Sequence, residues 1–340
     1  MIKKYIKVML KNELLNLASY GFFKKAMSPW KNSVAFFCFH RVLPRERIES
    51  DGNPNHEFTV STEFFDNFLK ELKKTHRLCS LDEAIDHLRN GSSEQIAHIT
   101  FDDGYKDNLD YALPILEKHN APATIYITTR FAEGDAWVWW IELWDIVLAS
   151  DSIAYRFDNQ DVDLDCHSKQ DKVIIFKHLS EKFSSLTIEQ QKELLWSLSK
   201  STKRASYFDL CLNWSDIKRL DAHPLITIGS HTHSHPNLSV ETDDDAFYEI
   251  AHSKLLLEAG LGRKIDHLAY PFGGRGEFGI REIDIAKNIG YVSAVTTICK
   301  KWDKDSLFTL PRYFVTESSS PSILQSRISG LCNILGHQLV

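Results

Sequence analysis

Eight short runs of β-forming residues recur along this chain, and helical patterns separate most of them. The runs cover residues 33–40, 77–81, 96–102, 122–128, 225–230, 266–272, 291–297 and 309–315. Most are apolar throughout rather than alternating, which is typical of parallel strands covered on both faces. Helical patterns cover residues 107–119 and residues 241–259. Thr242 is the predicted N-cap of the second helix. This order favours an α/β fold built on a parallel sheet or barrel.

One long stretch, residues 135–215, interrupts the alternation. It begins with the tryptophan-rich segment WVWWIELW at 137–144, continues through a polar acidic segment at 157–172, and returns to helical patterns such as 185–199. Because no Pro/Gly-rich linker flanks it, we interpret it as a helical subdomain inserted between two barrel strands. The alternative is a separate small domain.

Charge is distributed unevenly over the 340 residues. The net charge of −6 gives no footprint of a nucleic-acid-binding protein. Residues 1–31 nevertheless hold seven lysines and a single acid, Glu13. Residues 1–25 mix these lysines with apolar residues in an amphipathic pattern, which suits either peripheral contact with an anionic membrane or packing against the barrel. We therefore expect a basic arm at 1–32, the barrel at 33–320 and a helical tail at 321–340.

Cysteine usage and hydropathy bear on the compartment. The six cysteines are dispersed without a CxxC pair, and most lie in apolar runs, which predicts free core thiols in a reducing environment. No run approaches 18 apolar residues, and lysines interrupt the apolar pattern of the N-terminus, so neither a membrane span nor a secretory signal is expected. These features predict a cytoplasmic protein, with peripheral attachment to the inner face of the membrane as an option.

Four polar clusters follow predicted strands. They are His40, the pair Asp102–Asp103, the segment SHTHSH at 230–235, and PFGG at 271–274. Because βα loops converge at the carboxyl end of a barrel, we expect these clusters to meet in one site.

The histidine-rich cluster has metal-ligand chemistry. His231 and His235 are four residues apart, so a helical turn or a compact loop aims both rings at one point. With an aspartate they offer ligands suited to zinc or another divalent first-row ion, and three protein ligands leave a position for water. The alternative is a polar surface turn. His233 lies between the two and is expected to point elsewhere.

The adjacent carboxylates of Asp102 and Asp103 repel each other unless a cation is present. One carboxylate can then bind the metal while the other acts as general base. The alternative is a pair of turn acids before Gly104. A glycosidase is disfavoured, because its two carboxylates must straddle a bond at about 5–9 Å.

Three segments in order, TFDDGY at 100–105, SHTHSHP at 230–236 and AYPFGG at 269–274, resemble the polysaccharide deacetylase family with the NodB-homology domain, which is similar to carbohydrate esterase family 4. FHRVLP at 39–44 and TLPR at 309–312 resemble further segments of that family. The resemblance covers most of 33–316, leaving out the helical insertion, and it implies a distorted (β/α)7 barrel. It also implies a metal-dependent hydrolase that deacetylates N-acetylated sugars.

The resemblance assigns the metal ligands and the base. Asp102 corresponds to the catalytic base, and Asp103, His231 and His235 correspond to the ligands of a divalent metal. Zn²⁺ is expected, with Co²⁺, Ni²⁺ or Mn²⁺ as alternatives. LGHQLV at 335–340 does not match the C-terminal Leu-x-His of the family's best-known form. In deacetylases that resemble this chain the first-strand histidine is the general acid, and this resemblance implies that role for His40. The alternative for His40 is a buried histidine bonded to a neighbouring loop.

Other expected site residues depart from the family pattern or extend it. The arginine usual in the third motif is missing from AYPFGG. Arg312 is expected to replace it as the partner of the base, and Arg275 is a second candidate. Tyr105, Phe272 and Gly273 are expected to contact the substrate or the oxyanion, the last two through backbone N–H groups.

The expected reaction is hydrolysis of the N-acetyl amide of an amino sugar, releasing acetate. The substrate would be a surface polysaccharide, a lipopolysaccharide or a lipid-linked glycan. The alternatives are an amidohydrolase of the same superfamily acting on a non-sugar linear amide, and a non-catalytic carbohydrate-binding relative. Trp137, Trp139, Trp140 and Trp144 are expected either to stack on sugar rings or to form the core of the insertion. No feature specifies an oligomeric state.

Overall fold

The computed structural model describes residues 33–51, 57–91, 93–157, 160–198, 207, 209–298, 300, 302 and 306–319. The predicted arm at 1–32 and the predicted tail at 321–340 lie outside these residues, as does Cys299.

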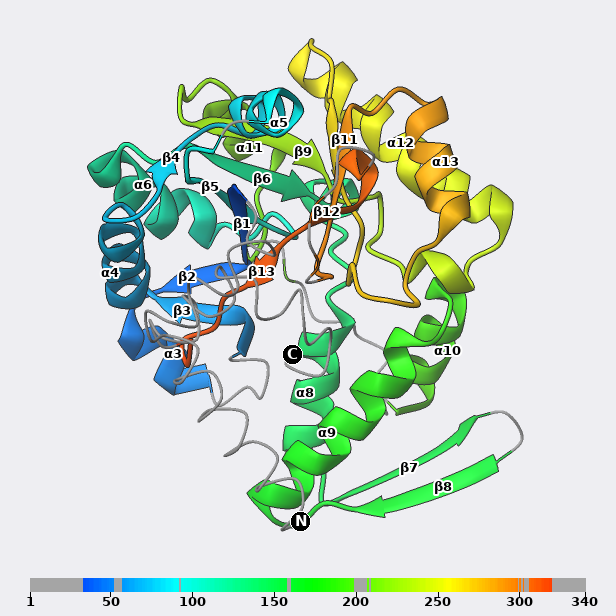
Figure 1. Cartoon of the computed structure of the whole chain (residues 1–340). Helices are drawn as coiled ribbons and strands as arrows, with labels where there is room; N and C mark the ends of the chain where they lie inside the picture. Colours follow the sequence, from blue (N-terminus) through cyan, green and yellow to red (C-terminus); the bar gives the residue numbers. More distant parts are fainter. Residues whose placement is uncertain are drawn as a thin grey trace.

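A parallel sheet curls into a nearly closed barrel with helices around it (Figure 1). Its strands follow the order β12–β11–β10–β9–β6–β5–β1–β13, and the short strand β4 (Arg77–Leu78) pairs with β5. The strand bounds are β1 Val34–Phe39, β5 Ile96–Phe101, β6 Ala123–Ile127, β9 Ile226–Ser230, β10 His267–Ala269, β11 Ser293–Thr296, β12 Leu310–Pro311 and β13 Tyr313–Phe314.

The two ends of this strand order are consecutive in the sequence. β12 pairs with β11, β13 pairs with β1, and Arg312 alone lies between them. The ring is therefore bridged by one broken strand. Counted in this way, the described part of the chain forms a seven-stranded parallel barrel, which confirms the predicted fold class.

Burial explains why the strands read as apolar runs. Every residue of β1, β5, β6 and β11 is buried, since one face lines the barrel interior and helices cover the other. The covering helices are α4 Thr62–Leu72, α5 Leu81–Asn90, α6 Leu113–His119, α11 Trp214–Asp221, α12 Asp243–Leu261 and α13 Ile280–Asn288. The predicted cap of α12 is present, since the Asp245 N–H donates to Thr242 Oγ1 at 3.2 Å.

Smaller elements connect the barrel strands. The helix predicted at 107–119 begins as a π-helix, η3 (Asn108–Ala112), before α6. The others are β2 Arg41–Leu43, α3 Arg45–Asp51, β3 Thr59–Ser61, α7 Thr129–Ala132, and the 3₁₀ turns η4 Leu238–Val240 and η5 Leu307–Thr309.

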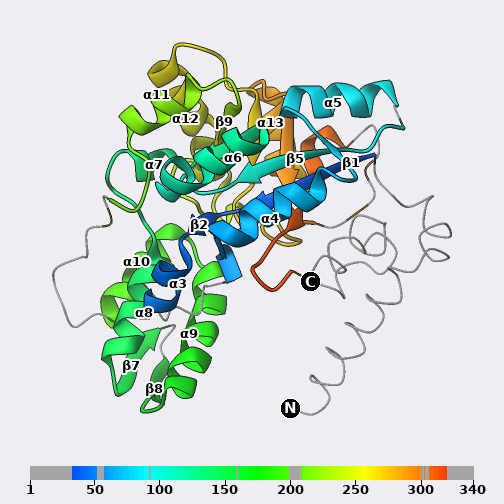
Figure 2. The same cartoon turned by 90° about the vertical axis from the view of Figure 1, so that its left-hand side faces the viewer.

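The inserted segment, predicted at 135–215, packs around a hydrophobic core beside the barrel (Figure 2). Its elements are α8 Trp139–Ala149, β7 Ser152–Phe157, β8 Gln160–Asp165, α9 Lys169–Ser184 and α10 Ile188–Leu198. The insertion is mainly helical, as expected, but it also contains the antiparallel hairpin β7–β8, which was not predicted. The second strand of this hairpin, QDVDLD, is largely solvent-exposed. Acidic and apolar residues alternate in it as in a strand, but it contains few of the β-branched and aromatic residues that are typical of strands.

The described cysteines, Cys38, Cys79, Cys166 and Cys211, are free and buried, as expected of core thiols. Within the described residues, no helix combines the length and apolar composition needed to cross a bilayer.

His98, fully buried in β5, makes the fold sensitive to acid. Its Nδ1 lies 2.8 Å from the Cys79 carbonyl oxygen and its Nε2 lies 2.9 Å from Thr124 Oγ1. Burial lowers the pKa of His98 from 6.5 to about 4. Between these two values the unfolded chain binds a proton that the native protein does not, so stability falls as the pH drops.

We expect His98 to remove about 3 kcal/mol of unfolding free energy between pH 7 and pH 4, at about 1.4 kcal/mol per pKa unit. Urea unfolding at several pH values should show a shallower pH dependence for His98→Gln than for the wild type. The exposed His178→Gln serves as control. Equal pH slopes for His98→Gln and the wild type would contradict this assignment.

Candidate active site

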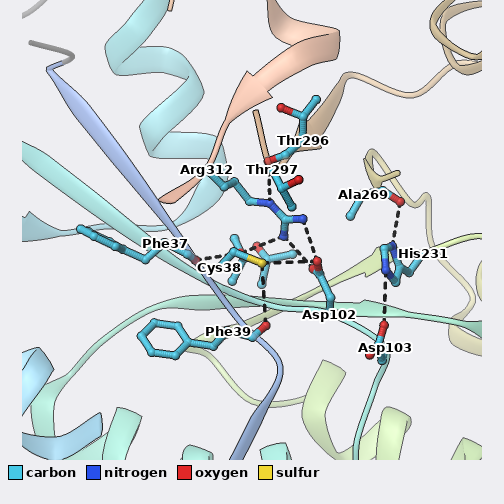
Figure 3. A network of polar contacts seen from close by, with 12 residues as sticks. Phe37, Cys38, Phe39, Asp102, Asp103, His231, Ala269, Thr296, Thr297 and Arg312 are labelled. Carbon is cyan, nitrogen blue, oxygen red and sulfur yellow. Dashed lines mark hydrogen bonds and ion pairs between the residues drawn. The ribbon is translucent and has the colours of Figure 1, made fainter. Parts of the chain in front are cut away.

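The expected site residues meet at the carboxyl end of the barrel, and Figure 3 shows the centre of the cluster. They are His40 after β1, Asp102 and Asp103 after β5, His231 and His235 after β9, Phe272 and Gly273 after β10, and Arg312 between β12 and β13. Parallel strands bring these sequence-distant loops together because all of them end at one edge.

The loops that carry these residues are conformationally strained. Of the five non-glycine residues with positive φ in the described chain, four lie here: Asp103, Thr232, His235 and Phe272. Each such residue costs about 1–3 kcal/mol and persists only where the surrounding structure enforces it. Strain concentrated in this way is typical of functional loops.

Asp103, His231 and His235 converge on one point. Asp103 Oδ1 lies 3.4 Å from Nε2 of His231 and 3.4 Å from Nε2 of His235. Donor atoms sharing a tetrahedral Zn²⁺ at ~2.0–2.1 Å lie about 3.3–3.4 Å apart, so the spacing matches a zinc ligand set. All three residues are buried and form a group able to hold a metal ion.

The hydrogen bonding of the triad also fits a cation. Asp103 Oδ1 is buried without a hydrogen bond of acceptable geometry, which is costly for a carboxylate unless a cation compensates it. His231 Nδ1–H donates to the Ala269 carbonyl oxygen at 2.8 Å, which leaves the Nε2 lone pair directed to the Asp103 side. The residues present therefore suit a divalent metal.

The two histidines of the triad differ in their proton affinity. Burial lowers the pKa of His235 to about 4, so its ring is neutral at pH 7. Burial acts the same way on His231, but the charges of Asp102 and Asp103 outweigh it and raise its pKa. Because a histidine must be neutral to bind a metal, a proton on His231 would compete with a metal ion for this ring.

Asp102 forms a buried, bidentate ion pair with Arg312 (Figure 3). Nη1 donates to Oδ1 at 2.6 Å and Nη2 donates to Oδ2 at 2.7 Å. Burial by itself would raise the pKa of Asp102, but the charge and hydrogen bonds of Arg312 hold it well below its usual range. The carboxylate therefore stays ionised, as a general base requires.

Arg312 occupies the point where the barrel closes. Its Nη1 also donates to Thr100 Oγ1 at 3.0 Å, and its Nε donates to the Thr296 carbonyl oxygen at 3.2 Å. The guanidinium thus links β5 to β11 while it pairs with Asp102. The second candidate, Arg275, is solvent-exposed. The structure brings Arg312 and Asp102 together, and their catalytic roles stay predictions.

His40 lies beside Asp102. One of its ring nitrogens, the Cys38 Sγ and an Asp102 carboxylate oxygen lie within 4.8 Å of one another. The His40 ring packs edge-on against Phe58 and Phe314, and its Nδ1 is buried without a hydrogen-bond partner. Burial lowers the pKa of His40, so the ring is neutral at pH 7 in the free protein. To act as an acid, His40 must first receive a proton.

Cys38, His40 and Asp102 form a second group with metal-ligand atoms, but it is poorly suited to a cation. Arg312 already neutralises the carboxylate, and burial raises the pKa of the Cys38 thiol well above its usual value. The thiol instead donates to Asp102 Oδ2 at 3.4 Å. This contact was not predicted, because Cys38 and Asp102 lie 64 positions apart on different segments of the barrel.

Asp107 and Asn108, directly after the aspartate motif, hold the His40 segment. Asn108 Nδ2 donates to the His40 carbonyl oxygen at 2.8 Å, and Asp107 accepts from the Val42 N–H at 3.0 Å and from Arg41 Nε at 2.9 Å. Sequence reasoning missed these residues. The sequence signal that could have found them is the pair of polar residues at the start of the helix predicted at 107–119.

The three residues predicted to contact the substrate or the oxyanion differ in whether their polar groups are already hydrogen-bonded. The Tyr105 hydroxyl accepts from Trp140 Nε1 at 3.1 Å, and its ring is buried. The Gly273 N–H donates to the Pro271 carbonyl oxygen at 2.6 Å, which argues against Gly273 as an oxyanion donor. Within the described residues the Phe272 N–H has no acceptor, so it is the better candidate. The intervening His233 points away, its Nδ1 lying 2.9 Å from Thr129 Oγ1.

Comparison with known families and structures supports this architecture. The profile of the family described as polysaccharide deacetylase matches residues 89–294, more than half of the chain. The comparison with curated proteins found no match.

Several solved structures share the fold. The Streptococcus pyogenes deacetylase PplD, in complex with acetate, is 19% identical with a TM-score of 0.57, covering 87% of this chain and 97% of its own. IcaB from Ammonifex degensii is 18% identical with a TM-score of 0.56 and the same coverage, 87% and 97%. A de-N-acetylase from Aggregatibacter actinomycetemcomitans is 14% identical with a TM-score of 0.54, covering 86% and 99%.

Proposed function

The chain belongs to the polysaccharide deacetylase family, a family of hydrolases of non-peptide carbon–nitrogen bonds, and on this premise we propose that it is a metal-dependent de-N-acetylase. Its substrate would be an N-acetylated amino sugar in a surface polysaccharide, a lipopolysaccharide or a lipid-linked glycan. The observation that carries the proposal is the buried Asp103–His231–His235 triad beside the ionised Asp102. The structural neighbours described as a deacetylase with acetate and as a de-N-acetylase support the choice of acyl group.

Asp103, His231 and His235 would hold the divalent metal. When bound, it supplies Lewis acidity that polarises the amide carbonyl and lowers the pKa of water. Asp102 accepts a proton from the attacking water as the new carbon–oxygen bond forms. Arg312 orients Asp102 and keeps it ionised. The Phe272 N–H would donate to the developing oxyanion.

The proton then has to reach the leaving amine. Asp102, whose pKa is held low, retains a proton poorly, whereas the ring of His40 is the nearby base. A His40 nitrogen lies within 4.8 Å of an Asp102 oxygen, a separation that one bridging water spans. We propose that the proton passes from Asp102 to His40 and from His40 to the nitrogen as the carbon–nitrogen bond breaks. The products are acetate and a free amino sugar.

Acetate release from a panel of N-acetylated glycans tests the function. We expect activity on at least one glycan, loss of that activity after chelation, and recovery on adding Zn²⁺ or Co²⁺. His231→Ala should abolish the metal response. His233→Ala, from the same loop, should retain it because the His233 ring contacts Thr129 rather than the triad.

Activity unaffected by thorough chelation would contradict the metal-dependent mechanism. Release of acyl groups from linear amides but from none of the glycans would instead favour the non-sugar amidohydrolase.

A further inference from the structure

The two histidines of the triad are oriented by different means. His231 is fixed by the hydrogen bond from its Nδ1 to the Ala269 carbonyl oxygen. His235 Nδ1 is buried and has no hydrogen-bond partner in the described chain. Metal-binding histidines almost always donate that second ring N–H to an acceptor, which fixes the tautomer and the ring plane. Packing must therefore supply the orientation of His235.

Three rings surround His235. The centroid of Phe272 lies 5.0 Å away, that of His231 lies 4.9 Å away, and that of Trp140 lies 5.4 Å away. Phe272 and His235 themselves have positive φ, at 59° and 64°. A ligand on strained backbone without a hydrogen bond depends on these neighbours to stay in place.

Trp140 is the member of this group that comes from the inserted segment, at the start of α8. Its indole is held by a hydrogen bond and by packing against a neighbouring ring. Its Nε1–H donates to the Tyr105 hydroxyl at 3.1 Å, and its ring packs against Trp139 with centroids 5.5 Å apart. Tyr105 in turn lies two residues after Asp103 and pairs through its backbone with Cys211, at the end of the insertion. The indole therefore connects the insertion to both the aspartate loop and the histidine loop.

The other tryptophans of the cluster have a different role. Trp137 donates to Gln191 Oε1 at 3.0 Å, Trp139 stacks on Phe183, and Trp144 packs edge-on against Phe176. These contacts lie within the hydrophobic core of the insertion. Trp140, partly buried, is the member of the cluster that contacts a triad ligand.

We propose that Trp140 is a positioning residue for His235, and that the inserted segment thereby completes the metal site. Through the indole, the insertion restricts rotation of the His235 ring so that Nε2 stays directed at Asp103. The inference rests on the proposed metal site, and it adds a residue from outside the barrel on which metal affinity depends.

Metal affinity of the full-length protein tests the inference directly. Zn²⁺ binding is measured by competition with a chromogenic chelator, and Co²⁺ coordination by its visible absorption. We expect Trp140→Leu to weaken Zn²⁺ binding about 10-fold or more, the range typical of groups that orient metal ligands. Trp140→Phe keeps an aromatic ring against His235 and should stay within about threefold of the wild type. Trp196→Leu, a control from the same insertion that is 68% exposed, should bind like the wild type.

The thermal midpoint of the chelated protein separates positioning from folding. Trp140→Leu should unfold near the wild-type temperature once metal is removed, and Trp140→Met, which fills the space without a rigid ring, gives a second test if Trp140→Leu does not fold. Unchanged Zn²⁺ affinity and Co²⁺ spectrum in a folded ring-less variant would overturn the inference while leaving the proposed function intact. Failure of the wild type to bind either ion would overturn both.

Discussion

Asp102→Asn should lower the deacetylation rate at saturating substrate by at least about 100-fold, because a positioned general base contributes roughly 10²–10⁴. The amide cannot accept the proton of the attacking water. Asp103, His231 and His235 are untouched, so Zn²⁺ binding should persist. Steady-state acetate release and the chelator competition assay, run on the same preparation, separate the two effects.

Asp216→Asn is a suitable control for Asp102→Asn. Asp216 is also a buried aspartate, but it accepts from the Asn213 N–H in the capping box of α11 and pairs with Lys106 at 3.5 Å, and neither partner is a triad residue. The Asp216→Asn variant should be less stable than the wild type but should deacetylate the substrate at the wild-type rate. A folded, metal-replete Asp102→Asn protein with the wild-type rate would remove Asp102 from the role of base.

Arg312→Met should destabilise the protein by about 3–5 kcal/mol, the usual cost of leaving one member of a buried ion pair uncompensated. The substitution also removes the hydrogen bonds to Thr100 and Thr296 at the closure of the barrel. Urea unfolding measures this loss.

The same variant should change the pH profile of the reaction. Arg312 opposes the effect of burial on Asp102, so without the guanidinium the pKa of Asp102 rises. A base must be ionised, so the acidic limb of the rate profile should move to higher pH. An unchanged limb would show that the titration belongs to another group.

A double-mutant cycle isolates the ion pair. In Asp102→Asn/Arg312→Met both charges of the pair are removed together, so the double variant should be less destabilised than the sum of the two single variants. Strict additivity would indicate that Arg312 acts mainly through its links to Thr100 and Thr296.

Local sequence patterns were sufficient to predict much of the fold and the residues at the centre of the site. Continuous apolar runs predicted buried parallel strands because neither face of those strands meets water. The aspartate pair and the HxxxH spacing predicted ligands on two strand ends, since strand ends in a parallel barrel share one edge. The hairpin β7–β8 escaped prediction because acidic, half-exposed strands derive their stability from pairing rather than from composition.

Contacts between distant residues needed the folded chain. Arg312 and Asp102 are 210 positions apart, and nothing in TLPR distinguishes Arg312 from Arg275 as a partner for the base. The distinction arises because Arg312 interrupts the strand that closes the barrel. In the same way, Trp140 reads like its neighbours at 137–144, and only packing places it against His235.

Strand period, apolar composition and the type of a candidate ligand are local properties, so the order of strands and helices and the group Asp103, His231 and His235 could be predicted from the sequence. Only the folded chain shows that Arg312 neutralises Asp102, that the Gly273 N–H donates to the Pro271 carbonyl oxygen, and that the Trp140 indole packs against His235. Each of these depends on which side chains the closed barrel brings within hydrogen-bonding or packing distance, and that is set by the whole chain.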